Sequence, residues 1–280
     1  MKNILSNLLK IKQHKPKISI VIPCYNVERF LPDLFSYLQN QTFQDFEIIF
    51  VDDKSSDNTV QILEEYKKQN DNRVTLIKLP DNNGAGYARN MGLKYIKGKY
   101  TIFLDADDIY MPNLLEEVYK AAEKNNTDIT MFKSICFDDK TKEYSKEDIW
   151  WLWTPPFPIN KKFTPRDVQD KLFTFCKGAL WNKLYKTSFI KKNKFRFLNI
   201  RKHNDSFFCY SAYVVAKSMF ILDKVLIAYR INLDTSITTL GKKIDNKCTK
   251  ISIDELEKFL KSKHVYKKYN KALLEYKRTH

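Results

Sequence analysis

The stretch FLDADD, residues 103 to 108, ends a run of residues typical of a buried strand and carries three carboxylates. Carboxylates crowded at one spot raise each other's pKa unless a cation or hydrogen-bond donors lie among them. Asp105 and Asp107 face the same side of an extended chain, because the residue between them takes the opposite side. Such oxygen ligands suit Mg²⁺ or Mn²⁺, which combine them with substrate phosphates. The simpler alternative is that Asp107 or Asp108 caps a helix expected near Pro112.

From residue 17 onward, strand-like and helix-like segments alternate along the chain. Short β-branched or aromatic runs, which favour strands, occupy residues 17–23, 46–51, 74–79, 100–104 and 128–132. Segments with the apolar spacing of amphipathic helices lie between them, at residues 27–39, 58–69, 86–96 and 111–124. Apolar strands separated by single helices predict an α/β fold, with a Rossmann-like, mostly parallel sheet and helices on both faces.

The ends of the predicted strands carry polar residues. Ligands of parallel sheets bind at the carboxyl ends of the strands. Three strands end there in PCYN (23–26), in Asp52 and Asp53, and in the FLDADD carboxylates, so we expect these segments to converge. Neither the glycine pattern of a dinucleotide-binding fold nor that of a P-loop follows the first strand, which speaks against both classes.

Two segments near this rim add further polar groups. In VDDKSSDNT (51–59), Asp53 is the candidate for accepting hydrogen bonds from a base or ribose. Ser56 or Asp57 is expected to cap the next helix, which gives Asp57 a structural role. In NNGAGYARN (82–90), a glycine-rich entry to a helix carries Arg89 in its first turns. Amide groups with a guanidinium favour a pyrophosphate, although an ordinary turn with a surface arginine would give the same pattern.

After about residue 138 the alternating pattern loosens. An aromatic, proline-bearing stretch contains WWLW (150–153), whose rings would either stack on sugar rings or be buried in a core. Helical spacing returns at residues 166–176 and 205–218, and strand-like runs occupy 219–223 and 225–230. The second half therefore predicts a second set of helix-like and strand-like elements.

The net charge of +16 is unevenly distributed along the 280 residues. Residues 1–17 carry five lysines and no acid, residues 186–202 carry seven basic residues and no acid, and residues 241–280 carry twelve basic against five acidic residues. Such an excess indicates affinity for polyanions, so a non-enzymatic polyanion-binding protein is one alternative function. Apolar residues at helical spacing in both termini predict amphipathic helices, which either lie on an anionic membrane surface or pack on their own domain.

The cysteines and the N-terminus bear on the compartment. The five scattered cysteines show neither CxxC spacing nor a Cys/His cluster of zinc type, which fits a reduced compartment. The first residues lack the apolar core and cleavage site of a secretion signal, and no run of about 18 apolar residues occurs. We therefore expect a cytoplasmic protein that does not span a membrane.

Four ordered segments together resemble the nucleotide-sugar domain of family 2 glycosyltransferases, which have the GT-A fold. They are IPCYNVERFL (22–31), VDDKSSDNT, NNGAGYARNMGL (82–93) and FLDADD. The likeness covers residues 17–135 and extends more weakly, through WNKLY (181–185) and YRINLDTSIT (229–238), to about residue 240. With it the chain divides into a basic amphipathic segment at 1–16, a nucleotide-sugar-binding domain at 17–138, an acceptor-binding part of the same catalytic domain at 139–240, and a basic helical tail at 241–280.

The resemblance also implies roles for individual residues on the donor side. The implied donor-binding residues are Pro23, Tyr25 and Asn26 around the base and ribose with Glu28 beside them, Asp53 on a uracil-like edge, and Asn83, Arg89, Asp105 and Ala106 toward the ribose, phosphate or sugar. Asp107 is implied as the residue that holds a divalent metal, Mn²⁺ or Mg²⁺. Lys54 departs from the glycine that many relatives have at that place.

The resemblance places the catalytic base late in the chain. Inverting members use a carboxylate of a Glu-Asp pair at the start of a helix, and the matching place here reads RKHNDSFF (201–208). Asp205 is therefore the implied base, with Asn204 in the place of the glutamate, unless Asp205 only N-caps the helix. His203 is a rival base because histidine titrates near neutrality, and it is otherwise expected on the acceptor side. Trp181 is expected there too, with a core role as its alternative.

The resemblance thus implies an inverting, metal-dependent hexosyl- or N-acetylhexosaminyltransferase. It would move a single sugar from a nucleotide diphosphate donor, expected to be a UDP-sugar, to a hydroxyl of a glycan or lipid-linked glycan in cell-surface polysaccharide or lipooligosaccharide synthesis. The chain lacks the Gln-x-x-Arg-Trp motif and the membrane spans of processive synthases, which favours single additions.

Two further expectations concern partners and the alternative enzyme. The basic termini are expected to permit peripheral contact with the inner face of the membrane, and no nucleic-acid partner is expected. A haloacid-dehalogenase-like phosphohydrolase also uses a DxD motif at a strand end. In that class the motif follows the first strand, whereas here it follows the fourth predicted strand.

Overall fold

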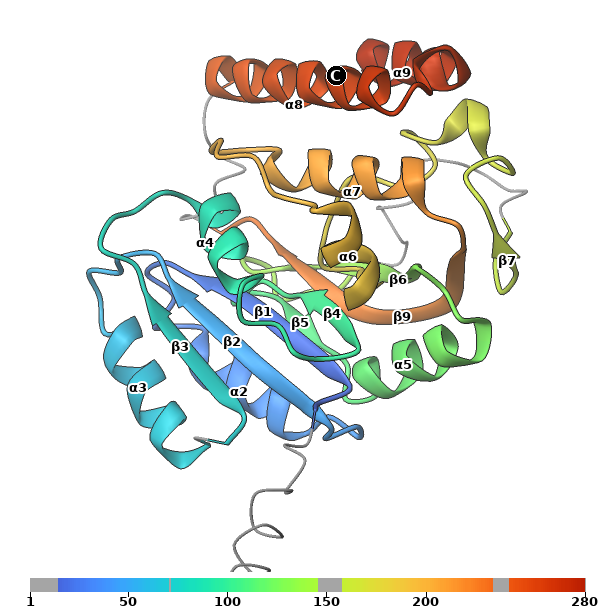
Figure 1. Ribbon diagram of the computed structural model, residues 1–280. Coiled ribbons are helices and arrows are strands. Elements are labelled where there is room, and N and C mark those ends of the chain that lie inside the picture. The colour runs from blue at the N-terminus through green and yellow to red at the C-terminus, as the bar shows by residue number, and fades with distance from the viewer. Residues whose placement is uncertain (1–14, 71, 146–157, 234–241, 280) are drawn as a thin grey trace, which may run out of the picture.

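The computed structural model describes residues 15–70, 72–145, 158–233 and 242–279. Within them, a nine-stranded sheet forms the centre of the molecule and helices cover both of its faces (Figure 1). Most of the N-terminal segment predicted at 1–16 lies outside the described residues, and so do Trp150, Trp151 and Trp153.

Four parallel strands form the first half of the sheet. They are β3 (Val74–Lys78), β2 (Phe46–Asp52), β1 (Ile18–Cys24) and β4 (Tyr100–Phe103), in that spatial order. β1, β2 and β4 are buried almost throughout, which explains why their sequences are continuous apolar runs rather than alternating patterns. Because the strands are parallel, the segments that follow them leave the sheet at the same rim.

The second half of the sheet is mixed. β8 (Lys183–Lys186) pairs antiparallel with β4 and with β6 (Ile129–Asp138), and β6 pairs in parallel with β9 (Met219–Ile231). Two short strands, β5 (Ile109–Tyr110) and β7 (Lys162–Phe163), pair antiparallel with β9. The main path of the sheet is β3-β2-β1-β4-β8-β6-β9-β5, and its longest ladders are parallel. The predicted α/β class with a mostly parallel sheet is confirmed.

Three helices cover one face of the sheet, namely α2 (Leu31–Gln39), α3 (Thr59–Gln69) and α5 (Leu114–Asn125). Their apolar sides form one core cluster with side chains of β1 and β2. α2 begins with a proline in its first turn, where the missing N–H would have no helical partner anyway. These helices match three of the segments predicted from apolar spacing.

The other face is covered by α4 (Ala85–Gly92), α6 (Thr187–Asn193) and α7 (Asn204–Val215), and α8 (Lys242–Ser262) and α9 (Tyr266–Thr279) lie on the outer side of α7 (Figure 1). α7 is buried on almost every residue, because helices and sheet enclose it from several sides. The tail predicted at 241–280 is helical as expected. Its apolar residues pack in the same core cluster as α7, including Leu256, Leu260, Leu273 and Tyr276.

Three predicted elements differ in the structure. Residues 166–176, predicted to be helical, form turns around a short 3₁₀ helix, Gln169–Lys171. Every side chain from 172 to 176 is buried, so the apolar residues there reflect enclosure on all sides rather than the one buried face of an amphipathic helix. The runs 219–223 and 225–230 are one strand, β9, and the exposed residues where they meet, 223–225, mark a register shift against β6 rather than a turn. The helix predicted at 86–96 is α4 and ends at Gly92.

The cysteines and the helices bear on the expected compartment and on membrane crossing. All five cysteines are buried thiols. Among the described helices, none combines the length and the apolar character that crossing a bilayer requires.

Gly92 lies where α4 packs against β1, so a substitution there tests this packing. A Cβ added there would lie 2.5 Å from Val21 Cγ1, so α4 would have to move away from β1. We expect Gly92→Ala to lower the free energy of unfolding by about 1–3 kcal/mol, as overpacked core substitutions do. Urea unfolding followed by circular dichroism measures this change.

The matched control removes the clashing methyl groups. Val21→Ala alone also destabilises the core, but Gly92→Ala combined with Val21→Ala should destabilise less than the sum of the two single changes. Strict additivity would contradict the contact.

Candidate functional site

The segments that follow β1, β2 and β4 lie together at one rim of the sheet. Asn26, after β1, accepts hydrogen bonds from the segment after β2. That segment contacts the entry to α4 through Asp53 and Asn83, and α4 contacts the turn after β4 through Arg89 and Asp105. The convergence predicted from the strand ends is therefore present as a continuous chain of hydrogen bonds.

The loop after β1 presents an aromatic ring. Half of the Tyr25 side chain is exposed, at 50%. Behind it, Asn26 has φ 52°, and its Oδ1 accepts the Ser56 N–H at 2.8 Å. Glu28 Oε2 accepts the backbone and side-chain N–H groups of Asn58, each at 2.8 Å. Asn26 and Glu28 thus tie two loops together, while the Tyr25 ring faces outward.

The turn after β2 accommodates its unusual residue. Lys54 has φ 63°, the left-handed conformation that glycine adopts most readily, so its departure from glycine leaves the backbone turn in place. Pro23 pairs with Val51 near the ends of β1 and β2. Asp57 Oδ1 accepts the N–H of Thr59, the first residue of α3, at 3.0 Å, which fits a structural role. Asn58 holds the N-cap position and no side chain caps α3 in the described structure, so the expected capping by Asp57 is wrong.

Asp53 is buried and uses both carboxylate oxygens inside the protein. Its Oδ1 accepts the Asn83 N–H at 2.9 Å, and its Oδ2 accepts the Gly84 N–H at 2.7 Å. Gly84 has φ 87°, so the turn that brings its amide to Asp53 requires a residue without Cβ. Asp53 therefore shapes the entry to α4, and its implied contact with a base stays a prediction. The Asn83 side chain, on the exposed side of this turn, donates to Asp81 O at 2.9 Å.

Arg89 is a buried cation that joins two distant segments. Its Nη2 lies 2.6 Å from Asp105 Oδ1, and its Nη1 donates to Asn204 Oδ1 at 2.9 Å. Burial alone lowers the pKa of Arg89, but the carboxylates of Asp105 and Asp205 outweigh it, so the net shift is upward. The surface-arginine alternative considered from the sequence is wrong.

Gly86 explains how α4 approaches the second half of the chain. A Cβ at this position would lie 2.3 Å from Leu198 O and 2.9 Å from Asn204 Cβ. Only glycine permits this approach, which brings Arg89, one turn further along α4, to Asn204. Asn204, noted from the sequence as a departure from glutamate, is thus the neutral acceptor of a buried guanidinium.

The three carboxylates of residues 105–108 lie in different surroundings. Burial, followed by the charge of Asp105, raises the pKa of Asp107 to about 6. Burial and the neighbouring carboxylates raise the pKa of Asp108 well above its usual range, although Asp108 Oδ1 accepts the Arg230 N–H at 2.9 Å. In the described structure α5 starts at Leu114 without a side-chain cap, so the capping alternative is wrong. Ala106 is buried between the two aspartates of the DxD motif.

Raised pKa values mean that the protein's own donors do not match the negative charge of this turn. Asp108 Oδ2 is buried without a hydrogen-bond partner among the described residues. Hard carboxylate oxygens with unmatched charge fit Mg²⁺ or Mn²⁺. No group of three or more His, Cys, Asp or Glu side chains in the described parts of the chain is arranged to hold a metal by itself. At such sites the ion typically takes its remaining ligands from substrate phosphates and water.

Asp205 lies beside this cluster, on the first turn of α7. Burial raises the pKa of Asp205, while Arg89 and His203 act in the opposite direction. The N-cap position belongs to His203, with φ 56°, and α7 has no side-chain cap in the described structure, so the capping alternative for Asp205 is wrong. A partly buried carboxylate with a raised pKa, near a guanidinium, is suited to accept a proton.

Trp181 lies under the site rather than on its surface. Its side chain is buried, and its ring stacks on Tyr229 with centroids 5.4 Å apart and planes at 14°. Burial first, and then Asp108, raise the pKa of Tyr229, so this ring pair lies close to the carboxylates. The implied acceptor role of Trp181 stays a prediction, and the structure places its ring in the packing beneath the cluster.

Two residues at the site, Asp139 and Arg230, had no predicted role. Asp139 accepts hydrogen bonds from Arg29 at 2.7 Å, Arg230 at 2.8 Å and Lys142 at 2.9 Å. Burial alone raises the pKa of Asp139, but these three cations outweigh it and hold the pKa well below its usual range. Arg230 belongs to YRINLDTSIT (229–238), which carried a weak part of the resemblance. Its contact with Asp139 depends on the pairing of β6 with β9, which the sequence alone does not show.

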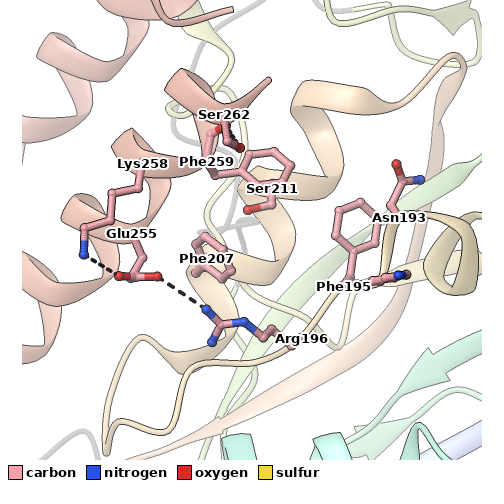
Figure 2. Close-up of a pocket in the computed structure, with 10 residues that line it drawn as sticks. Asn193, Phe195, Arg196, Phe207, Ser211, Glu255, Lys258, Phe259 and Ser262 are labelled. Atoms are coloured by element: carbon pink, nitrogen blue, oxygen red, sulfur yellow. Dashed lines mark hydrogen bonds and ion pairs between the residues drawn. The ribbon is translucent and has the colours of Figure 1, made fainter. Parts of the chain in front are cut away.

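A groove between α6, α7 and α8 lies apart from these carboxylates (Figure 2). Aromatic rings of Phe195, Phe207 and Phe259 line it. On its rim Glu255 pairs with Arg196 at 3.4 Å and Lys258 at 2.8 Å. The rim charges thus neutralise one another in part, and none of the predicted site residues lines the groove.

Removal of the His203 imidazole should raise the pKa of Asp205 further, because His203 acts to lower it. We expect His203→Gln to shift the titration of the Asp205 carboxyl to higher pH, as measured by ¹³C NMR of aspartate-labelled protein. His264→Gln, in the turn between α8 and α9, is the matched control and should leave the titration unchanged, because His264 is not among the groups that shift the pKa of Asp205 most. An unchanged or lowered Asp205 pKa in His203→Gln would contradict this placement.

In sequence, the chain is similar to known glycosyltransferases. The model of the family described as glycosyl transferase family 2 matches residues 19–183. Poly(ribitol-phosphate) beta-glucosyltransferase of Bacillus spizizenii is 35% identical over 207 residues, which is 72% of this chain and 30% of that protein. Glycosyltransferase GlyG of Streptococcus pneumoniae is 28% identical over 220 residues, which is 76% of this chain and 70% of that protein.

Solved structures share the fold. The crystal structure of S. aureus TarS 1-349 superposes with a TM-score of 0.66 at 23% identity, covering 86% of this chain and 65% of that one. The mannosyltransferase PcManGT from Pyrobaculum calidifontis, in complex with GDP-Man and Mn²⁺, gives a TM-score of 0.57 at 14% identity and covers 79% of this chain and 59% of that one. At these identities the structures show the fold alone. Because the family model covers more than half of its residues, this chain belongs to glycosyltransferase family 2.

Proposed function

We propose that this protein transfers a single sugar from a nucleotide diphosphate donor, a UDP-sugar, to a hydroxyl of a glycan or lipid-linked glycan, with inversion at the anomeric carbon. The observation that carries this proposal is the cluster in which Arg89 holds Asp105 beside Asp107 while Asp205 lies next to the same guanidinium. Solved structures of TarS with UDP and with UDP-GlcNAc have the same fold, which supports a UDP-sugar. The cell-surface polysaccharides or lipooligosaccharides to which such glycans belong are the proposed destination of the sugar.

The donor would lie along the rim from Tyr25 to Asp105. The exposed Tyr25 ring offers a face on which a base stacks, and Asn26, Glu28 and Pro23 fix the loop that carries it. Asp53 and Asn83 shape the neighbouring turn, where the uracil edge and ribose would contact them. The positive charge of Arg89 would attract the diphosphate, and its ion pair would hold Asp105 toward the ribose or sugar.

Asp107 would hold a divalent cation, Mn²⁺ or Mg²⁺. Its raised pKa and the unmatched charge of the turn fit such an ion, and the Mn²⁺ complex of PcManGT supports it by analogy of fold. When bound, the cation neutralises charge that develops on the leaving diphosphate.

Asp205 would act as the general base. Its carboxylate takes the proton of the acceptor hydroxyl as that oxygen bonds to the anomeric carbon, and the bond from that carbon to the diphosphate breaks on the opposite face. The raised pKa makes Asp205 a stronger base than an exposed aspartate. Because the carboxyl must be ionised, the transfer rate should fall as pH drops through a pKa above the ordinary value of 3.8.

The acceptor would approach from the side of His203 at the start of α7, with Trp181 beneath the site. The lysines of the terminal segments would supply any contact with the inner face of the membrane, because the apolar side of α8 and α9 packs within the protein. A cytoplasmic location is proposed with it.

The two alternative functions have less support. A haloacid-dehalogenase-like phosphohydrolase carries its DxD after the first strand, whereas here it follows β4. A polyanion-binding protein is suggested by charge alone, which does not account for the buried Arg89–Asp105 pair.

A panel of nucleotide sugars tests the function. We expect one UDP-sugar, with Mn²⁺ or Mg²⁺, to raise Tm and to be hydrolysed slowly in the absence of acceptor. Phosphate release from simple phosphoesters without donor turnover would instead favour the phosphohydrolase. RNA binding that weakens steeply with salt, without donor turnover, would favour the polyanion binder.

Asp205→Asn tests the assignment of the base. It should lower kcat of transfer by about 10²- to 10⁴-fold, the usual contribution of a general base, and leave UDP binding intact. Asp170→Asn, a change of an exposed carboxylate that pairs with Lys271 on α9, is the control and should keep wild-type rates. A folded Asp205→Asn protein with wild-type kcat would rule Asp205 out as the base.

A further inference from the structure

Arg230, near the end of β9, contacts the DxD turn from two directions. Its backbone N–H donates to Asp108 Oδ1 at 2.9 Å, and its side-chain Nε donates to the carbonyl oxygen of Asp107 at 2.7 Å. One residue of β9 therefore holds both the Asp107 carbonyl and the Asp108 side chain. The orientation of the peptide between Asp107 and Asp108, and with it the direction of the Asp107 side chain, depends on where β9 places Arg230.

β9 places the turn itself as well. Immediately after Asp108, Ile109 pairs with Ala228 and Tyr110 pairs with Ile227 in the β5–β9 ladder. The register of this ladder brings Arg230 level with the turn. A strand more than a hundred residues later in the chain thus fixes the carboxylates that follow β4.

The Arg230 side chain is itself fixed. Its Nη1 donates to Asp139 Oδ1 at 2.8 Å, and its guanidinium lies 5.4 Å from the Phe30 ring centroid and 5.1 Å from that of Phe137. The side chain is only 8% exposed, so the guanidinium has little freedom to leave the turn. Asp139 also accepts a hydrogen bond from Arg29, which belongs to the loop after β1. One carboxylate thereby connects the loop of Tyr25 with the DxD turn.

We propose that Arg230 is a positioning residue for the metal-holding carboxylate of Asp107. This inference rests on the proposed function, in which Asp107 holds the cation. A guanidinium has only donors and does not bind a cation, so Arg230 acts through the Asp107 backbone and not as a ligand. Substitution of a residue that orients a metal ligand in this way typically lowers the metal affinity by a factor of about 10–100.

Arg230→Lys tests the inference. Lysine keeps the charge but lacks the planar fork that serves Asp107 O and Asp139 together. With UDP present, we expect the affinity for Mn²⁺, measured from the EPR signal of free Mn²⁺, to fall about 10- to 100-fold. UDP affinity in EDTA, measured by calorimetry, should stay within about threefold of wild type, because the Tyr25 loop and Arg89 are untouched.

The matched control is Arg73→Lys. Arg73 also lies over a ring, 4.9 Å from the Phe46 centroid, and donates to Gln44, but at the opposite end of β2. It should change neither affinity. Asp139→Asn, which removes the charge that holds Arg230 while keeping the side-chain shape, should weaken Mn²⁺ binding in the same direction and carries the test if Arg230→Lys does not fold.

The outcomes separate the inference from the proposed function. Wild-type Mn²⁺ affinity in Arg230→Lys, or in Asp139→Asn where that variant carries the test, would overturn the positioning role. In Arg230→Lys, an equal loss of UDP binding in EDTA would overturn it too, because Arg230 would then be a general structural residue. If the wild-type protein with UDP binds no Mn²⁺, the metal part of the proposed function fails first, before any substitution is made.

Discussion

The buried guanidinium of Arg89 holds the two halves of the site together. It lies 2.6 Å from Asp105, after β4, and donates at 2.9 Å to Asn204, on α7. Loss of Asp105 would leave the buried guanidinium without its charge partner, which costs about 3–5 kcal/mol when one partner of a buried pair is removed. Loss of Asn204 would leave a buried N–H donor without its acceptor, which costs about 1–3 kcal/mol. Gly86 makes the arrangement possible, because any side chain there would meet Leu198 and Asn204. The distance between the donor side and the candidate base is thus set by α4.

Around that cation the protein gathers more negative charge than it neutralises. Burial raises the pKa of Asp107, Asp108 and Asp205, and each shift records a charged form that lacks sufficient partners in the protein alone. This excess of negative charge is the basis for proposing that the site takes a cation and that one of its carboxylates accepts a proton. Asp139 shows the contrast, since three cations surround it and its pKa is lowered. Carboxylates with raised pKa and the one with lowered pKa differ here in their partners, not in their residue type.

Much of the fold followed from local patterns, and less of the site did. The four parallel strands and the rim at their ends were predictable, because each apolar run and the carboxylate that ends it form a local pattern a few residues long. The partners of Asp53 were not, since it takes two backbone amides that have no signature in the sequence. Arg230 and Asp139 meet only through the β6–β9 pairing, and residues 166–176 look helical although they are buried turns. Long-range pairing is what the local patterns left out.

The most direct measurement is a double-mutant cycle between Arg89→Met and Asp105→Asn, with the free energy of unfolding in urea as the readout. Because the ion pair is largely buried, the account predicts that the two changes are not additive, with a coupling of about 1–3 kcal/mol. The second substitution should matter much less once the first has been made. Additivity within about 0.5 kcal/mol would contradict the claim that this pair joins the halves of the site.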